Sequence, residues 1–506
     1  MYYFIVFLVA ICSLVYEVLL STLSSYLIWN SVVQFTLTIW LFLLGLGVGS
    51  YLSKFSKNSF KNFINIELIL AILWGFSVLI IKWAYILLSD YSVLFELFYF
   101  FYVILIWSLT GFEVPLISDI LDKKDEENQS ELKEIIWDVF TYDYIGSLVA
   151  TFLFPFILLP YLWLTYTAFV VGIFNIIAAF IFLSRKETKQ NLIKLKLYKS
   201  SLIKLFFWFL VLIFWMLYAS ARFETVWDHF FYKEPIVLKT HSPYQEIVIT
   251  KRGNDIRLLL DGHLQFLSLD EHRYHSSLYS QAKNYLQTLS WEKNILILWW
   301  WDGLLARNII QSLSWTKFKI TLVDLDPKMT HLAQTYPLLV KLNKNSLNNP
   351  NVKVINEDAF TFLLKDNKQK YDAIFADFPD PRNVEIAKLY SKEMYLLIKK
   401  SLKTNWIFTT QAWNAFFTKE SYWCIYKTVQ SIWEKPFAYH AYLPSFGDWG
   451  FVWFKKWAKI EKLTWDYILK NFDKDYLVDL NKIRENDLDN EIIVNYYLKG
   501  RSRFNE

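Results

Sequence analysis

Hydrophobic residues are distributed in two different ways along the 506-residue chain. Up to residue 221 they form long runs, and most of these reach the ~20 residues that cross the core of a bilayer. The runs cover residues 2–21, 31–53, 66–88, 93–119, 142–159, 161–183 and 203–220. Beyond residue 221, short apolar segments alternate with amphipathic stretches, and charged residues become frequent. The pattern predicts a transmembrane helical domain of six or seven spans at 1–221 and a second part of a different class.

Strand patterns dominate the second part. Residues 236–270 predict antiparallel strands, with Gly253-Asn254 as the turn of a hairpin. Further along, buried strands alternate with helical stretches, which is typical of a parallel α/β sheet. These strands are expected at 294–298, 319–326, 352–358, 371–378 and 406–412.

These patterns divide the second part into three expected regions. We expect a small β-strand region at 222–285 and a Rossmann-like domain of the class I methyltransferase type at 286–455. A charged, helical tail is expected at 456–506.

Basic residues indicate which side of the membrane each end occupies, because they collect on the cytoplasmic side. They follow the second, fourth and sixth apolar runs, which places the amino terminus inside. They include Lys54, Lys57, Lys61, Lys123, Lys124, Lys133, Arg185, Lys186, Lys189, Lys194, Lys196 and Lys199. We expect an integral protein of a bacterial-type cell membrane with its catalytic domain in the cytoplasm, although seven spans instead of six would put that domain outside.

The amino-acid composition excludes several classes of protein. The chain is 54% hydrophobic and 20% charged, which excludes a disordered protein. Cys12 and Cys424 are too few for a disulfide framework or a zinc cage. The net charge of +5 is small for this length and points to no nucleic acid. We also expect no bound metal, since no cluster of metal ligands is visible in the sequence.

Acidic residues recur where the expected strands end. Each of them alone is compatible with a helix cap or a solvated loop, but together they predict a shared acidic cleft, because ligands of α/β sheets bind at the carboxyl ends of the strands. They are Asp302, Asp324, Asp326, Asp358, Asp377 and Asp380. Such a cleft suits a cation and disfavours a dinucleotide cofactor, which carries a pyrophosphate.

A set of motifs in one order resembles a known family along nearly the whole chain, namely the polyamine aminopropyltransferases (spermidine synthases) in their membrane-bound form. The motifs are GFEVPL (111–116), DYIGSL (143–148), SPYQEIVIT (242–250), LDGHLQF (260–266), DEHRYH (270–275), ADFPDP (376–381) and PSFGDWGF (444–451). The resemblance implies transfer of an aminopropyl group from decarboxylated S-adenosylmethionine, as co-substrate, to an amine such as putrescine. Spermidine and methylthioadenosine would be the products, and no cofactor is required.

The resemblance also implies roles for individual residues. Asp377 would be the base that removes a proton from the amine. The amine would be bound by Tyr274, Asp380 and Phe446. The co-substrate would be bound by Gln245, His275, Asp302, Gly303, Asp324, Asp358 and Ala359. A polyamine and the lipid bilayer are then the expected partners, and a homo-oligomer is compatible with the chain.

Two other functions fit part of the pattern. A methyltransferase that uses S-adenosylmethionine would share the sheet and the acids at 324 and 358. A membrane protein that binds or transports polyamines without turnover would need the acidic cleft alone. The paired acids of ADFPDP and the β region that precedes the sheet favour aminopropyl transfer.

Tryptophan and glycine occur in unusual amounts. The chain has 23 Trp and only 13 Gly, whereas glycine is usually ~7% of a protein. Trp299, Trp300 and Trp301 stand where the resembling family has glycines, and Trp163, Trp291, Trp406 and Trp433 also fall at glycine-like places, whereas Trp423 and Trp449 look native. We hypothesise that a stop-type codon, read here as tryptophan, is translated as glycine by the organism.

Overall fold

The protein is described by a computed structural model with two compact units, Met1–Ile236 and Val237–Glu506. The structure describes residues 2–28, 31–88, 91–125, 132–299, 301–365, 369–433, 435–455, 468–469 and 472–502. The predicted boundary at 221–222 falls inside the last helix of the first unit, which runs to Tyr232.

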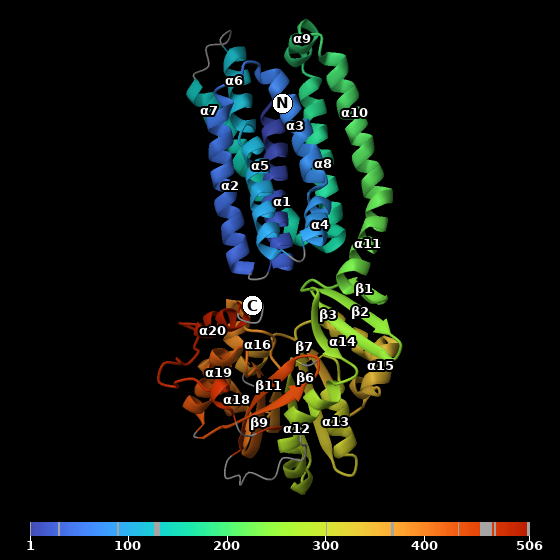
Figure 1. Cartoon of the computed structure of the whole chain (residues 1–506), viewed down its shortest axis with the longest axis vertical. Coiled ribbons are helices and arrows are strands. Elements are labelled where there is room, and N and C mark those ends of the chain that lie inside the picture. The colour runs from blue at the N-terminus through green and yellow to red at the C-terminus, as the bar shows by residue number, and fades with distance from the viewer. Residues whose placement is uncertain are drawn as a thin grey trace. The chain divides into compact units, whose positions relative to one another are not determined.

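The first unit is helical throughout its described residues (Figure 1). Long apolar sequences satisfy their backbone polar groups within each helix, which a bilayer requires. The helices are α1 (Tyr2–Ile28), α2 (Ser31–Ser53), α3 (Ser59–Gly75), α4 (Ser77–Leu88), α5 (Ser92–Thr110), α6 (Glu113–Asp125), α7 (Leu132–Leu153), α8 (Leu159–Leu183), α9 (Lys186–Lys194), α10 (Tyr198–Phe214) and α11 (Ser220–Tyr232). Short π-helical turns at Phe154–Leu158 and Trp215–Ala219 join α7 to α8 and α10 to α11.

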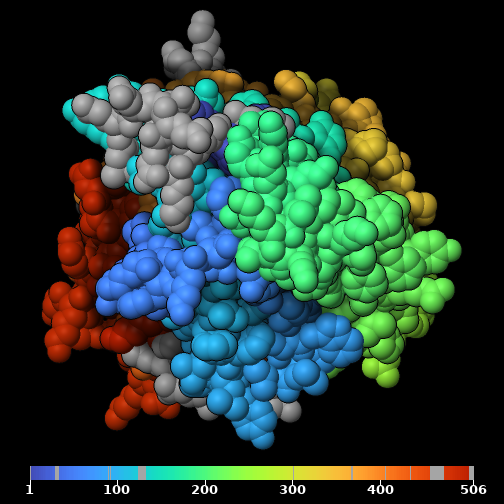
Figure 2. Space-filling model, turned by 90° about the horizontal axis from the view of Figure 1, so that it is seen from above, coloured from blue at the N-terminus to red at the C-terminus, as the bar shows by residue number. Residues whose placement is uncertain are grey.

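Five helical stretches are long and apolar enough to cross a membrane, or six if the bent pair α3–α4 is one span. Helix α1 packs against α2, α7 and α8, so it lies inside the bundle. Helix α10 lies at one edge and is mostly exposed; Figure 2 shows the green α9–α10 segment from above. The apolar helices are therefore candidate spans by length and composition.

The second unit begins with a four-stranded antiparallel sheet in the order β1-β2-β3-β4. Its strands are β1 (Ile236–His241), β2 (Glu246–Arg252), β3 (Asp255–Leu260) and β4 (His263–Leu267). Arg252 pairs with Asp255 across the predicted turn, and Gly253 takes the left-handed φ of 61° that the turn needs.

An eight-stranded sheet forms the centre of the second unit, in the order β12-β10-β11-β9-β8-β5-β6-β7. Strands β5 to β9 run parallel, and β10, β11 and β12 extend the sheet in antiparallel pairing. The strands are β5 (Lys293–Leu298), β6 (Phe318–Asp324), β7 (Val352–Asn356), β8 (Tyr371–Ala376), β9 (Leu402–Asn414), β10 (Phe437–Leu443), β11 (Gly447–Lys455) and β12 (Ile468–Leu469).

Helices cover both faces of this sheet (Figure 1). The longer ones are α12 (Glu271–Thr288), α13 (Leu304–Ser312), α14 (Pro327–Thr335), α15 (Pro337–Asn343), α16 (Ala359–Leu364), α18 (Lys392–Ser401), α19 (Lys419–Ile432) and α20 (Ile492–Ser502). Alternate residues of β5 face two separate apolar cores, with Ile295 and Ile297 in one and Leu296 and Leu298 in the other. This two-sided burial explains why the parallel strands read as continuous apolar runs.

The expected parallel strands are all present, and each starts within four residues of the predicted position. The antiparallel strands β10 and β11 were not predicted. Within the expected helical tail at 456–506, most of residues 456–471 lie outside the described part, and the described part forms a helix at Ile492–Ser502.

Candidate active site

The strand order of the large sheet reverses between β5 and β8. The chain passes from β5 outward to β6 and β7 and then returns to the other side of β5 with β8. Leu298 and Ala376 pair at the carboxyl ends of these two strands, so Asp302 and Asp377 follow neighbouring strands. This is the position where α/β sheets bind ligands.

Asp377 follows β8 and is held by contacts from two elements. Its backbone N–H donates to the carbonyl of Leu298 at 3.1 Å, and its carboxylate accepts a short hydrogen bond from the hydroxyl of Tyr274 on α12. Burial raises the pKa of Asp377 to about 7, although the bond from Tyr274 works against this rise. A carboxyl with that pKa can both accept and release a proton near neutral pH.

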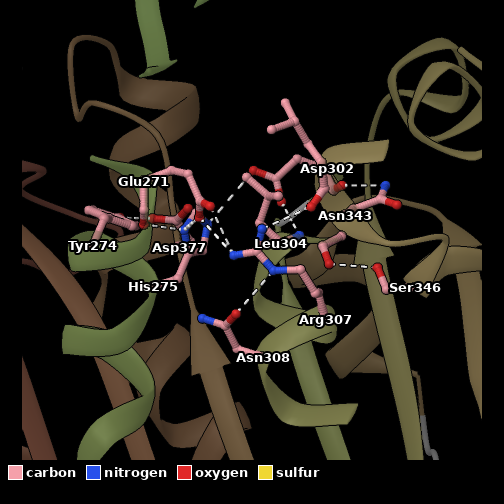
Figure 3. A network of polar contacts seen from close by, with 12 residues as sticks. Glu271, Tyr274, His275, Asp302, Leu304, Arg307, Asn308, Asn343, Ser346 and Asp377 are labelled. Carbon is pink, nitrogen blue, oxygen red and sulfur yellow. Dashed lines mark hydrogen bonds and ion pairs between the residues drawn. The ribbon is translucent and has the colours of Figure 1, made fainter. Parts of the chain in front are cut away.

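An ion-pair network lies beside Asp377 (Figure 3). The Nδ1 atom of His275 lies 2.9 Å from a carboxylate oxygen of Glu271, and Arg307 contacts the same carboxylate at 3.0 Å. The hydrogen bonds and charges of these two partners lower the pKa of Glu271 to about 2, despite its burial. Burial lowers the pKa of His275, but the bond and charge of Glu271 outweigh it, so the pKa of His275 is raised.

The turn after β5 places Asp302 within this network. Its carboxylate accepts from the N–H of Leu304 at 2.7 Å, and its other oxygen lies 3.9 Å from Nε2 of His275. Burial raises the pKa of Asp302, and the positive charge of His275 opposes the rise. Gly303 has a φ of 77°, and a Cβ there would lie 2.6 Å from Oγ of Ser346, so this position requires glycine.

Asp324 ends β6 and is buried. One carboxylate oxygen accepts from the N–H of Asp326 at 2.9 Å, and the other has no hydrogen-bond partner. Burial raises the pKa of Asp324 to about 7. A buried oxygen without a partner is costly and is unusual in folded proteins. It is an open acceptor for a ligand hydroxyl.

Gln245 reaches this edge from the small sheet. Its side-chain amide donates to Asp326 at 3.1 Å, next to Asp324. The structure thus brings Gln245, His275, Asp302, Gly303, Asp324 and Asp377 to one edge of the sheet.

Asp358 is engaged differently from the other acids. It caps α16 by accepting from the backbone and the hydroxyl of Thr361, both at 2.9 Å, and it pairs with Lys388 at 3.1 Å. Burial raises the pKa of Asp358, but these contacts lower it more, so its pKa lies below the ordinary value. Ala359 is buried at the first position of that helix. A binding role for Asp358 and Ala359 stays a prediction.

Aromatic side chains contact one another around Tyr274. Asp380 accepts a short hydrogen bond from Tyr497 of α20. The ring of Trp449 lies 5.3 Å from that of Phe446 and 6.2 Å from that of Tyr274. Aromatic faces attract alkylammonium groups. An amine-binding role for Tyr274, Asp380 and Phe446 stays a prediction.

The tryptophans after β5 do not share one environment. Trp299 has a φ of 66°, and its backbone N–H donates to the carbonyl of Val323 at 2.7 Å. Trp301 is buried in the core, with its ring 6.2 Å from Phe266. Trp300 lies outside the described residues.

Four contributors to the site were not predicted from the sequence: Glu271, Arg307, Lys388 and Tyr497. The spacing of Glu271 and His275, four apart on one helix, was a readable signal for their pairing. No local signal connects Tyr497 to Asp380, because 117 positions separate them. Among the described residues, no group of three or more His, Cys, Asp or Glu is arranged to hold a metal ion.

Comparison with known proteins decides the family. A polyamine aminopropyltransferase of Leptospira interrogans is 34% identical over 98% of this chain and 97% of its own length. The chain belongs to the polyamine aminopropyltransferase family. Members from Oceanobacillus iheyensis and Streptomyces coelicolor are each 36% identical over 88% of this chain and cover 84% and 82% of their own lengths.

Residues 271–464 match the model of the spermine/spermidine synthase domain. The structure is also similar to spermidine synthase from Thermotoga maritima, with 21% identity and a TM-score of 0.38 over 52% of this chain and 84% of that one. The identity to the curated relatives and the domain match show that the protein is an enzyme, a polyamine aminopropyltransferase.

Proposed function

We propose that this aminopropyltransferase uses decarboxylated S-adenosylmethionine as donor and putrescine as acceptor, and that it forms spermidine and methylthioadenosine. The observation that carries the proposal is Asp377, which has a raised pKa and lies beside Tyr274 at the point where the strand order reverses. A carboxyl with this raised pKa is suited to take the proton that the acceptor amine must lose.

The acceptor amine is mostly protonated at neutral pH and has no lone pair until a base removes a proton. In the proposed step Asp377 takes that proton. The amine nitrogen then forms a bond to the aminopropyl carbon, and the bond between that carbon and sulfur breaks. The electron pair stays on sulfur, so the sulfonium becomes a neutral thioether. The attacking nitrogen takes up the positive charge that sulfur loses, and the transferred aminopropyl group carries its own ammonium with it.

The charge of the site supports the proposed donor. Decarboxylated S-adenosylmethionine is a sulfonium that also carries an ammonium and has no carboxylate. Asp302 and Asp324 offer negative charge to such a dication, and the unpartnered oxygen of Asp324 is an acceptor for a ribose hydroxyl. S-adenosylmethionine keeps its carboxylate, which these acids would repel, so methyl transfer is disfavoured.

The aromatic residues of the site support a diamine as the acceptor. Asp380 offers a charge for the distal ammonium of a diamine, while the rings of Phe446 and Trp449 can contact its methylene chain. A diamine that carries charge at both ends and is apolar between them matches this arrangement.

The proposal is tested with protein expressed in its organism of origin. The enzyme is given either decarboxylated or intact S-adenosylmethionine together with putrescine, cadaverine or spermidine, and the products are identified by mass spectrometry. We expect spermidine and methylthioadenosine from the decarboxylated donor with putrescine. Preference for another amine would overturn the assignment of putrescine, and turnover of the intact donor would overturn the donor assignment.

We also propose that the helical unit anchors the enzyme in a cell membrane as an integral protein. The support is the set of apolar helices that are long enough to span a bilayer. Extraction by detergent, but not by carbonate or high salt, is the expected result for membranes that contain the full chain.

A further inference from the structure

Three tryptophans have backbone conformations that side chains rarely adopt. The φ angles are 56° at Trp163, 66° at Trp299 and 70° at Trp413. For a bulky residue a positive φ is a true outlier, whereas glycine adopts it freely. Trp163 also has a ψ of 179°, a combination that is essentially restricted to glycine.

The other residues with positive φ show that tryptophan is the exception. Among the described residues, the remaining non-glycine cases are all Lys, Asp, Asn or Glu. Several of these end helices, as Lys233 and Lys344 do, where a left-handed residue is common. The tryptophans have no such explanation.

A fourth tryptophan lies where two helices touch through their backbones. A Cβ placed on Gly45 of α2 would lie 2.5 Å from Cβ of Trp107 on α5, and a Cβ on Gly111 would meet the carbonyl of Leu46. Gly45 and Gly49 are four apart, as are Trp107 and Gly111. Close helix crossings in membranes use small residues at this spacing, so Trp107 occupies the place of a small residue.

Buried indole groups give an independent sign. The indole N–H of a buried tryptophan usually finds an acceptor. Within the described part of the chain, five such groups are buried without a hydrogen-bond partner. They belong to Trp74, Trp107, Trp433 and Trp453, and to Trp449, which the motif PSFGDWGF marks as native and which does not count toward the sign. The side chain of Trp315, in contrast, is 96% exposed, although tryptophan is highly buried on average.

We infer that Trp107, Trp163, Trp299 and Trp413 are glycine in the protein that the organism makes. One codon is translated as glycine there, and the scarcity of glycine beside 23 tryptophans follows from the same cause. Trp423 is not in this set. It lies inside α19 and, unlike Trp413, has no positive φ, so its backbone does not call for glycine and we expect it to be tryptophan.

The inference changes the picture of the active site. Glycine at 299, directly after β5, would leave the turn beside Asp302 without an indole, and the backbone there could approach a ligand closely. Only the identity of that ligand rests on the proposed function.

The decisive experiment is peptide mass spectrometry of the protein purified from its organism and digested with trypsin. The peptides 294–307 and 404–419 contain positions 299 and 413, and the adjacent peptide 420–427 contains Trp423 as an internal control. We expect glycine at 299 and 413 and tryptophan at 423. Tryptophan at 299 and 413 overturns the inference, and because the readout is mass, an inactive enzyme would not affect it.

The gene gives a second test. We expect one codon at positions 107, 163, 299 and 413 and a different codon at 423. The same codon at all five positions would overturn the inference.

A third test uses stability in an ordinary expression host. Trp299→Gly relieves a left-handed side chain and is expected to raise the melting temperature of the detergent-solubilised chain by about 2–4 °C. Trp423→Gly is the matched control and is expected to lower it, because it removes a satisfied indole from a helix. A decrease for Trp299→Gly as large as that for the control would contradict the inference.

Discussion

At the scale of single residues, the site works through the contrast between acids that are paired and acids that are not. Glu271 is held ionised by His275 and Arg307, with a pKa of about 2. Asp377 instead accepts a hydrogen bond from the neutral hydroxyl of Tyr274, and burial raises its pKa to about 7. Environments that separate the pKa values of neighbouring groups assign them different roles. These environments suit Glu271 to hold its neighbours in place, and they support the proposal that Asp377 exchanges protons.

The raised pKa of Asp377 predicts how activity depends on pH. The base must be ionised, so activity is present above the pKa and is lost as pH falls through about 7. The measurement is kcat/KM for the amine at saturating donor between pH 5 and 9, where the lower limb should lie near neutrality. A lower limb near the ordinary pKa of ~4 for aspartate would contradict the burial of this group.

The pairing of Glu271 predicts a loss of stability on neutralisation. Its pKa is lowered, so its contribution is present above the ordinary value of a glutamate and is lost as pH falls toward 2. Glu271→Gln should destabilise the second unit by roughly 2–3 kcal/mol at pH 7. A fall in melting temperature that is about twice as large at pH 7 as at pH 3 is expected. Glu292→Gln, in an exposed pair with Lys319, is the control.

Most acids of the site could be predicted from the sequence because they follow buried apolar strands directly. Asp302, Asp324 and Asp377 each come within four residues of a strand end, and parallel strands bring such positions to one edge. What each carboxylate does there was not predictable. Asp324 keeps an unpartnered oxygen, whereas Asp358 is occupied by Thr361 and Lys388, and these differences depend on residues that are distant in sequence.

At the scale of elements, the end of the chain contributes to the catalytic sheet. Helix α20 packs on α19, and Tyr497 reaches from it to Asp380. The sequence showed a charged, helical tail but not this contact, since nothing local in the pattern of 492–502 differs from an ordinary amphipathic helix. The antiparallel strands β10 and β11 were missed because they contain Ala438, Ala441, Gly447, Asp448 and Gly450, which are residue types depleted in strands.

The contact between Tyr497 and Asp380 predicts a specific effect on amine binding. Tyr497→Phe removes a hydrogen bond to a charged group, which is worth ~1.5 kcal/mol or more. We expect KM for the amine to rise about tenfold, with KM for the donor unchanged. Tyr496→Phe is the control, because the hydroxyl of Tyr496 bonds instead to the backbone N–H of Arg484 and the carbonyl of Lys482. Equal effects of the two variants would show that α20 contributes only packing.

At the scale of the whole molecule, the number of membrane crossings decides on which side of the membrane each end of the chain lies. The helical stretch Lys133–Leu183 has 51 residues, about 75 Å at ~1.5 Å per residue, which is more than twice the ~30 Å of a bilayer core. It contains a non-helical residue at Trp163, and α7 and α8 both pack against α1. The two helices therefore count as two candidate spans, and with the bent pair α3–α4 taken as one span this gives seven candidates.

We predict that all seven candidates cross the membrane, and an odd number of crossings would place the two ends of the chain on opposite sides. A cytoplasmic amino terminus and a cytoplasmic catalytic domain, both expected from the sequence, then exclude one another. Reporter fusions at residue 1 and residue 506 should report opposite sides. Reporters on the same side would show an even number of crossings and contradict this topology.

The central claim is that Asp377 is the base of aminopropyl transfer, and release of methylthioadenosine tests it most directly. The full chain, Asp377→Asn and the exposed control Asp479→Asn are expressed in the organism of origin and supplied with decarboxylated S-adenosylmethionine and putrescine. We predict that Asp377→Asn lowers kcat by about 10²–10⁴-fold while Asp479→Asn keeps full activity. An Asp377→Asn enzyme that is folded and turns over within a few-fold of the unchanged chain would contradict the claim.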